Sequence, residues 1–261
     1  MEGRSAYVIA TWGGPRRVED KLYAKDRTIY IRHHLAQLET LRHELDLVII
    51  AVPRDESQDY EFFDWLREEV QEKVGSARVE VFWRDNNQGL AFGSFEEAFL
   101  RYQERESIDW WYWFEDDYVP LLDRFDFQMR RVWEESKDPS FVAARISHHD
   151  TQGMPHAIIS IGMTSTEKIN QVRELHGGLV YLKEDSSDYA NHETYMSQRK
   201  FTNTFAQVGR LYDVTQRYAV GLRLKRGPCS WYGRGGAKII GPIHHLRPWH
   251  GGRYPTPEGY R

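Results

Sequence analysis

One short stretch in the middle of the sequence constrains the fold more than any other part of the chain. Five consecutive aromatic residues, Trp110–Phe114, are followed directly by Glu115, Asp116 and Asp117. Aromatic side chains favour strands, and a short apolar run of this kind is typical of a buried strand. We expect its ladder to stop at Pro120, which has no N–H to donate. The sequence therefore predicts a buried strand that ends in carboxylates.

The position of these carboxylates suggests a binding site. In open α/β sheets, ligands bind in the crevice outside the carboxyl ends of the strands. Carboxylates held there supply the hard oxygen ligands that Mg²⁺ and Mn²⁺ prefer, and such a metal in turn holds phosphates. Acidic triplets are also common in solvated turns. The aromatic run favours the functional interpretation, because a solvated turn does not need so buried a support.

The composition excludes several other classes of protein. With 261 residues, 40% of them hydrophobic and 28% charged, the chain is long enough for the sizeable core of a globular protein. A net charge of −4 gives no reason to expect nucleic-acid or membrane binding. No run approaches the roughly 20 apolar residues of a membrane span. The single Cys229 fits a reducing compartment, so we expect a cytoplasmic protein.

Strand and helix patterns alternate in the first half of the chain. Apolar runs predict strands at residues 7–11, 45–52 and 77–83 before the aromatic one. Helical spacing of apolar residues predicts a helix at 27–45, another around Phe62 and Leu66, and a third at 94–105. Ser94, with Glu97 three residues later, is expected to form a capping box at the third helix. This order predicts a parallel sheet with helices on its faces.

Loops after two of these strands carry residues suited to a ligand. After the first strand, Gly13 and Gly14 allow a ligand to approach the backbone closely. Arg16 or Arg17 in the same loop can bind a phosphate with two hydrogen bonds. The third predicted strand leads into a polar loop around Asn87, of the kind that wraps a ligand.

Three motifs in this half resemble those of GT-A glycosyltransferases, most closely the large family 2 group. The acidic end, residues 115–117, is similar to the Asp-x-Asp metal motif, with glutamate in the first position. Residues 55–59 (Asp-Glu-Ser-Gln-Asp) are similar to the Asp-Gly-Ser-x-Asp motif after the second strand, with Glu56 in place of glycine. Residues 87–91 (Asn-Gln-Gly-Leu-Ala) resemble the Asn-x-Gly-Leu/Pro-Ala stretch. The resemblance covers about residues 5–120.

The resemblance implies a nucleotide-sugar site at the carboxyl ends of the strands. Thr11 and Trp12 would line the base pocket, and Asp55 would meet the base or its ribose. Arg16 and Asn87 would complete the set of residues that bind the donor.

The resemblance also implies a metal site and a place for the sugar. Asp117 and Glu115 would ligate a Mn²⁺ or Mg²⁺ ion that bridges the diphosphate. Asp116 would lie nearer the sugar and take part in catalysis. A histidine late in the chain completes the metal site in many GT-A enzymes, and His245 is the candidate, with His250 as the alternative. A nucleoside diphosphate leaves poorly unless its developing charge is neutralised, which a metal achieves.

The second half carries the expected acceptor site. We predict a helix at residues 121–136, strands at 141–146 and 157–163, and a helix that begins near Asp188 and runs to about Gly209. An inverting transferase needs a carboxylate that removes the proton of the acceptor hydroxyl. The resemblance places this base at the start of that last helix, so Glu193 is the candidate, with Asp185 and Asp188 as alternatives. A glutamate is also favoured there by the helix dipole alone.

The expected fold is a single α/β domain of the GT-A (Rossmann-like) type over residues 1–261. A mostly parallel central sheet would have helices on both faces. Residues 1–120 would form the donor half and 121–226 the acceptor half. The glycine- and proline-rich residues 227–261 would form an irregular C-terminal segment.

The expected function is metal-dependent transfer of a sugar from a nucleotide-diphosphate donor to a hydroxyl acceptor such as a glycan. Inversion at the sugar is preferred, although a retaining enzyme would carry the same acidic motif without such a base. A sugar-phosphate nucleotidyltransferase is an alternative, but its glycine-rich basic loop is only partly matched by residues 13–17. A non-catalytic carbohydrate-binding protein is another, because aromatic residues, 14% of the chain, can stack on sugars.

Overall fold

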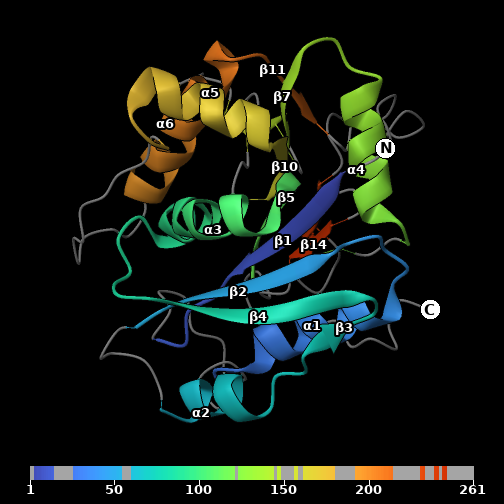
Figure 1. Cartoon of the computed structure of the whole chain (residues 1–261), viewed down its shortest axis with the longest axis vertical. Coiled ribbons are helices and arrows are strands. Elements are labelled where there is room, and N and C mark those ends of the chain that lie inside the picture. The colour runs from blue at the N-terminus through green and yellow to red at the C-terminus, as the bar shows by residue number, and fades with distance from the viewer. Residues whose placement is uncertain are drawn as a thin grey trace.

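The computed structural model describes residues 3–14, 26–54, 60–120, 123–143, 146–147, 156–157, 161–179, 192–213, 230–232, 238–240 and 243–245. Only the backbone is described at 146–147, 156–157, 192–199, 213 and beyond residue 229. These residues form an eight-stranded sheet in the order β11-β7-β10-β5-β1-β2-β4-β3, with helices on both sides (Figure 1).

The first half supplies the parallel part of the sheet, as the sequence predicts. The four parallel strands are β1 (Arg4–Ala10), β2 (Leu47–Pro53), β4 (Ala77–Arg84) and β5 (Ile108–Glu115). All seven residues of β2 are buried, which is typical of a strand covered on both faces. The short strand β3 (Lys73–Val74) pairs antiparallel with β4 at the edge.

The helices divide between the two faces of the sheet (Figure 1). One face is covered by α1 (Ile29–Thr40), α2 (Tyr60–Glu68) and α4 (Phe125–Glu134), and the other by α3 (Leu90–Glu106), α5 (Thr166–His176) and α6 (His192–Gln207). Alternate side chains of β5 pack into the two hydrophobic cores, one on each face of the sheet. Tyr112 and Phe114 pack with the first set of helices, and Trp111 and Trp113 pack with the second. The aromatic run therefore lies at the centre of both cores.

The second half extends the same sheet. Strand β10 (Gly162–Ser165) pairs antiparallel with both β5 and β7 (Pro139–Ala143), and β11 (Arg210–Asp213) pairs parallel with β7. The single strand predicted at 157–163 is wrong, because β9 (His156–Ala157) pairs separately with β8 (Ile146–Ser147). Helix α5 was not predicted from the sequence, although Ser165 caps it by accepting a hydrogen bond from the N–H of Lys168 (3.2 Å).

The predicted start of α3 needs a correction. The helix begins at Leu90, four residues earlier than expected, and Ser94 lies inside it. The Ser94 hydroxyl donates to the carbonyl of Leu90 (3.2 Å), and the Glu97 carboxylate binds Arg84 (2.7 Å). The serine and glutamate therefore form no capping box, because both belong to the surroundings of a buried arginine.

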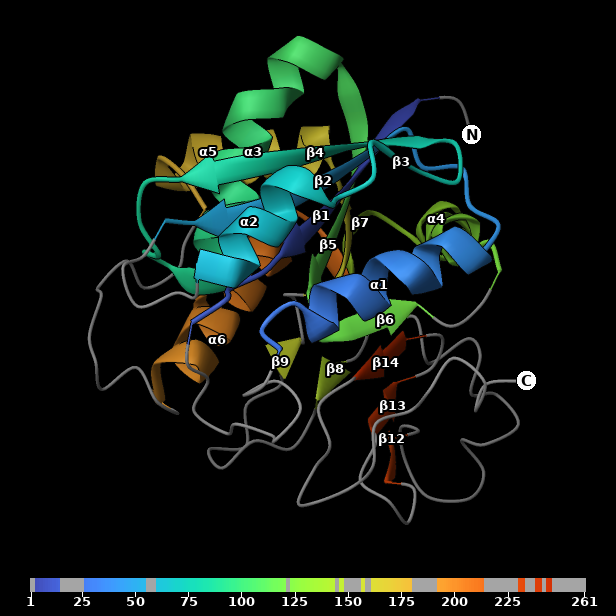
Figure 2. The same cartoon turned by 90° about the horizontal axis from the view of Figure 1, so that it is seen from below.

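The C-terminal segment contains strands where we expected irregular structure. Strands β12 (Ser230–Tyr232), β13 (Lys238–Ile240) and β14 (Ile243–His245) form an antiparallel sheet with β6 (Tyr118–Pro120) (Figure 2). The ladder of the aromatic strand also ends earlier than predicted. Strand β5 stops at Glu115 because a turn at Asp116 and Asp117 follows, and Pro120 is the last residue of β6.

Within the described residues, no helix combines the length and the apolar character needed to span a lipid bilayer.

Candidate functional site

The topology itself marks one edge of the sheet. The chain runs from β1 to β2 and β4 on one side of β1, then crosses to β5 on the other side. Of the helices along this path, α1 and α2 pack on one face and α3 on the opposite face. Such a reversal leaves a crevice outside the carboxyl ends of the two central strands. Here these ends are Thr11, after β1, and the turn at Asp116 and Asp117, after β5.

Asp116 joins the ends of β1 and β5. Its N–H donates to the carbonyl of Ala10 (3.0 Å), and its Oδ2 accepts from the hydroxyl of Thr11 (2.6 Å). The N–H of Thr11 in turn donates to the carbonyl of Ala51 in β2 (3.1 Å). The structure therefore brings together two residues that the sequence analysis assigned to one site, in a buried arrangement at the switch point.

A histidine that the sequence analysis did not select supports the same turn. The Nδ1 of His34 in α1 lies 3.2 Å from the carbonyl oxygen of Asp116, and its Nε2 lies 2.7 Å from the hydroxyl of Tyr7. Burial lowers the pKa of His34 to about 3 and raises the pKa of Tyr7 well above its usual value, so both side chains are neutral. The available signal was the place of His34 on the apolar stripe of α1, between Ile31 and Leu38.

The three acidic residues differ in exposure. Asp116 and Asp117 are buried, whereas Glu115 is partly exposed at the end of β5. No group of three or more His, Cys, Asp or Glu side chains is arranged to hold a metal ion in the part of the chain that the structure describes. Mg²⁺ is usually held by one or two carboxylates together with the phosphates of a substrate. Residues 115–117, which we call the acidic turn, fit a cation of that kind, which binds together with a diphosphate.

Two glycines after β1 are required by the packing around them. A Cβ atom on Gly13 would lie 2.3 Å from the Phe62 ring, and one on Gly14 would lie 2.6 Å from the Trp12 ring. Phe62 and Trp12 therefore cover this loop, and Trp12 itself is partly exposed. The predicted role of Trp12 in lining a base pocket stays a prediction.

The loop that contains Asn87 is organised by a buried arginine. The five N–H groups of Arg84 match five hydrogen bonds, which go to the carbonyls of Gln88 and Leu90, to Ser94 Oγ, and twice to the Glu97 carboxylate (2.7–3.2 Å). Gly93 lies against this group, because a Cβ there would be 2.0 Å from the carbonyl oxygen of Gln88. The sequence predicts the loop, but Arg84 as its support was missed.

Arg84→Met is expected to destabilise the fold by about 2–4 kcal/mol, because it leaves buried carbonyls and a partly buried carboxylate without their donor. Urea denaturation measures this change. Arg131→Met is the matched control, since Arg131 is 59% exposed and pairs with Glu135 on the helix surface. Equal losses in the two variants would contradict the structural role of Arg84.

The remaining candidates are only partly described. Arg16 and Asp55 lie outside the described residues. Glu193 is the second residue of α6 and His245 the last of β14, and for both only the backbone is described. Strand β14 lies beside β6 (Figure 2), and the register of the two strands places His245 opposite Tyr118, the residue that follows Asp117. Its predicted role as a metal ligand stays a prediction.

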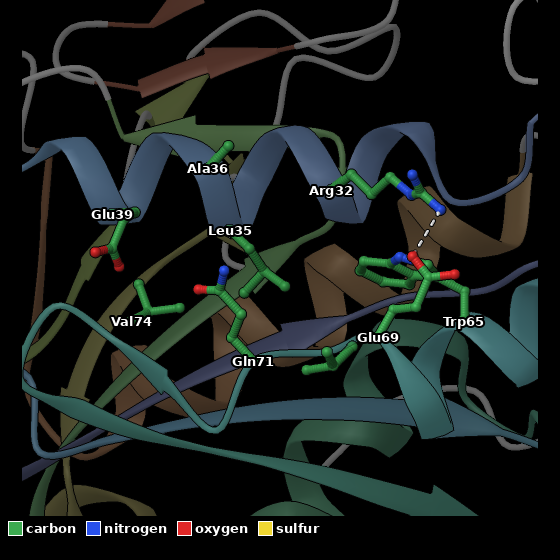
Figure 3. Close-up of a pocket in the computed structure, with 9 residues that line it drawn as sticks. Arg32, Leu35, Ala36, Glu39, Trp65, Glu69, Gln71 and Val74 are labelled. Carbon is green, nitrogen blue, oxygen red and sulfur yellow. Dashed lines mark ion pairs between the residues drawn. The ribbon is translucent and has the colours of Figure 1, made fainter.

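A groove of about 400 Å³ lies elsewhere, between α1 and the segment from α2 to β3 (Figure 3). Arg32 reaches across it to Glu69 (3.7 Å) and lies 5.0 Å from the centre of the Trp65 ring. None of the acidic-turn residues lines this groove. It is therefore separate from the crevice at the carboxyl ends of β1 and β5.

Comparisons with known proteins give structural similarities only. No protein-family model matches the chain, and a search of curated proteins finds no match. Three similar solved structures are the apo-form glycosyltransferase GlyE of Streptococcus pneumoniae TIGR4 (12% identity, TM-score 0.47), a 4-diphosphocytidyl-2C-methyl-D-erythritol synthase of Anaerococcus prevotii DSM 20548 (10%, 0.45) and S. aureus TarS (9%, 0.46).

The extent of these similarities differs between the three proteins. The matches cover 99% of this chain and 59% of GlyE, 81% and 88% for the synthase, and 85% and 38% for TarS. This chain thus spans less than two thirds of the length of GlyE.

Proposed function

We propose that this chain is a GT-A glycosyltransferase that transfers a sugar from a nucleotide-diphosphate donor to a hydroxyl acceptor such as a glycan. The observation that supports this proposal most is the acidic turn at the topological switch point, where Thr11 ties Asp116 to the end of β1. A crevice at this position is where α/β sheets bind nucleotides. The motif resemblance of residues 55–59, 87–91 and 115–117 gives the site its chemical class.

In this proposal the donor lies along the carboxyl edge of β1, β2, β4 and β5. Thr11, Trp12 and Asp55 contact the nucleoside, and Arg16 and Asn87 complete the donor pocket. Asp117 and Glu115 would hold Mn²⁺ or Mg²⁺, with His245 as a further ligand. When bound, such a cation supplies positive charge that stabilises the departing nucleoside diphosphate. Asp116 positions the sugar, since its own carboxylate is already held by Thr11.

The acceptor side of the proposal depends on Glu193. As the acceptor oxygen forms its bond to the anomeric carbon, the bond from that carbon to the diphosphate oxygen breaks. The proton of the acceptor hydroxyl passes to the Glu193 carboxylate, and the bonding electrons leave with the nucleoside diphosphate. This single displacement inverts the configuration at the sugar.

Thermal unfolding against a panel of nucleoside diphosphates, each with and without Mn²⁺, tests the donor site. One nucleotide is expected to raise the melting temperature only when Mn²⁺ is present, and Mn²⁺ alone is expected to change it little. A ligand at a hundred times its Kd stabilises the folded state by about 2.7 kcal/mol. Asp117→Asn is expected to lose this shift, measured against its own unliganded melting temperature.

Asp64→Asn is the matched control, because Asp64 is an exposed residue paired with Arg67 on the surface of α2. It is expected to keep the full shift. If no nucleotide raises the melting temperature of the native chain, the proposal is wrong. Sugar binding that depends on neither metal nor nucleotide would favour a carbohydrate-binding protein. Turnover of a nucleoside triphosphate with a sugar phosphate would instead identify a nucleotidyltransferase.

A further inference from the structure

The support of the acidic turn from α1 depends on one buried imidazole. His34 is completely shielded from solvent and lies between the turn and the Tyr7 hydroxyl, with contacts of 3.2 Å to Asp116 O and 2.7 Å to Tyr7 Oη. A carbonyl oxygen only accepts hydrogen bonds, so Nδ1 of His34 carries the proton and donates it. Nε2 then accepts from Tyr7. The two contacts fix both the tautomer and the plane of the ring.

The ring has little freedom to turn. Tyr7 meets it edge-on at 5.6 Å between ring centres, and Phe114 meets it edge-on at 6.1 Å. Tyr7 is itself stacked on Phe114 at 4.6 Å. The imidazole is therefore held by the two strands whose carboxyl ends form the crevice.

The bond from His34 acts on Asp117 as well as on Asp116. The carbonyl of Asp116 belongs to the peptide group that joins Asp116 to Asp117, and a peptide group is planar. Fixing the direction of that carbonyl fixes the orientation of the whole plane, including the bond that leads to the Cα of Asp117. The N–H and the side chain of Asp116 are held from β1, so His34 supplies the third fixed point of this residue.

We propose that His34 is a positioning residue, which fixes the peptide plane that places the Cα of Asp117, and so positions this carboxylate for binding of a divalent cation with a nucleoside diphosphate. This inference rests on the proposed function, because it assigns His34 a task within that site. Groups that orient metal ligands from behind typically change metal affinity by about 10–100-fold when they are removed.

Two substitutions separate the contacts of His34. In His34→Asn, the side-chain amide can occupy the position of Nδ1 and donate to the carbonyl of Asp116. In His34→Gln, the longer side chain places its amide near the position of Nε2, which can contact Tyr7 but not Asp116. Both variants keep a neutral polar group, so the burial penalty is similar in the two.

The measurement is titration of each protein with the nucleoside diphosphate that stabilises the native chain most, in Mn²⁺, with the unliganded melting temperature recorded in parallel. His34→Gln is expected to bind about 10–100-fold more weakly than the native chain, and His34→Asn within a few-fold of it. His33→Asn is the control on the same helix, since Nε2 of His33 has no hydrogen-bond partner among the described residues, and it is expected to bind as the native chain does.

The outcomes distinguish this inference from the proposed function. If the native chain responds to Mn²⁺ and nucleotide but His34→Gln binds equally well, the inference is wrong and the proposed function stands. The inference is also wrong, and the proposed function stands, if nucleotide binding by both variants weakens only as much as their unliganded melting temperatures fall. His34 would then be a purely structural residue. If the native chain shows no metal-dependent response, the proposed function fails, and the inference fails with it.

Discussion

Trp113→Ala is expected to lower the free energy of unfolding by about 3–5 kcal/mol, the cost of removing a large aromatic side chain from a close-packed core. Trp113 is fully buried and stacks on Phe95 with 5.2 Å between ring centres and 6° between planes. The ring centre of Trp113 lies 5.7 Å from that of Phe141 in β7 and 5.6 Å from that of Phe201 in α6. The indole therefore joins elements of the first half of the chain to elements of the second.

Urea denaturation followed by circular dichroism measures this effect, and it also tests whether the two halves unfold together. We expect a single unfolding transition, which shifts to lower urea concentration in Trp113→Ala, because the two halves share the core around Trp113. Trp110→Ala is the control, since Trp110 is only partly buried and packs on Trp133 on the opposite face of the sheet. Trp110→Ala is expected to lower the free energy of unfolding by no more than ~2 kcal/mol. Equal losses, or two separate transitions in the native chain, would contradict a shared core.

Glu193→Gln is expected to lower kcat by about 10²–10⁴-fold while the nucleotide-dependent thermal shift is kept, because a missing base affects the proton transfer and not donor binding. Helix α6 is anchored to the strand that carries the acidic turn, through the contacts of Phe201 and Phe205 with Trp113. Glu193 lies about two turns before Phe201 on this helix. The measurement is release of nucleoside diphosphate during turnover of the donor.

A matched control separates catalysis from helix stabilisation. Glu167 occupies the first turn of α5, as Glu193 occupies that of α6, so both glutamates interact favourably with a helix dipole. Glu167→Gln is expected to leave kcat unchanged. If Glu193→Gln behaves in the same way, Asp185 and Asp188 become the candidates for the base, or the enzyme retains configuration and needs none.

The sequence predicts the parallel part of the fold because that part depends on local patterns. Strands such as β2 are continuous apolar runs, and α1 has apolar residues at helical spacing, so both can be recognised without any partner. The carboxyl ends of these strands then follow from the topology. The resemblance to GT-A glycosyltransferases assigns Thr11 and Asp116 to one donor site, and the structure joins the two by a hydrogen bond.

The features that the sequence does not reveal depend on partners far along the chain. The start of α3 was misplaced because Ser94 and Glu97 look like a capping box, whereas both bind Arg84, which precedes the helix. The local sequence gives His34 no visible task, because its partner Asp116 is 82 positions away. The strands near the C-terminus were missed because each is only three residues long, which is too short to show a period, and lies in a glycine- and proline-rich segment. Their pairing with one another and of β14 with β6 is not visible in local sequence.

The pairing of β14 with β6 also implies an order of folding. Every strand of the eight-stranded sheet is complete once the chain has been synthesised to Asp213, whereas Tyr118 meets its partner His245 only after more than thirty further residues. Joining segments more than a hundred residues apart carries a large loop-closure entropy, so such contacts tend to form late. During synthesis, the large sheet can therefore assemble while the strand that follows the acidic turn still has an unpaired edge.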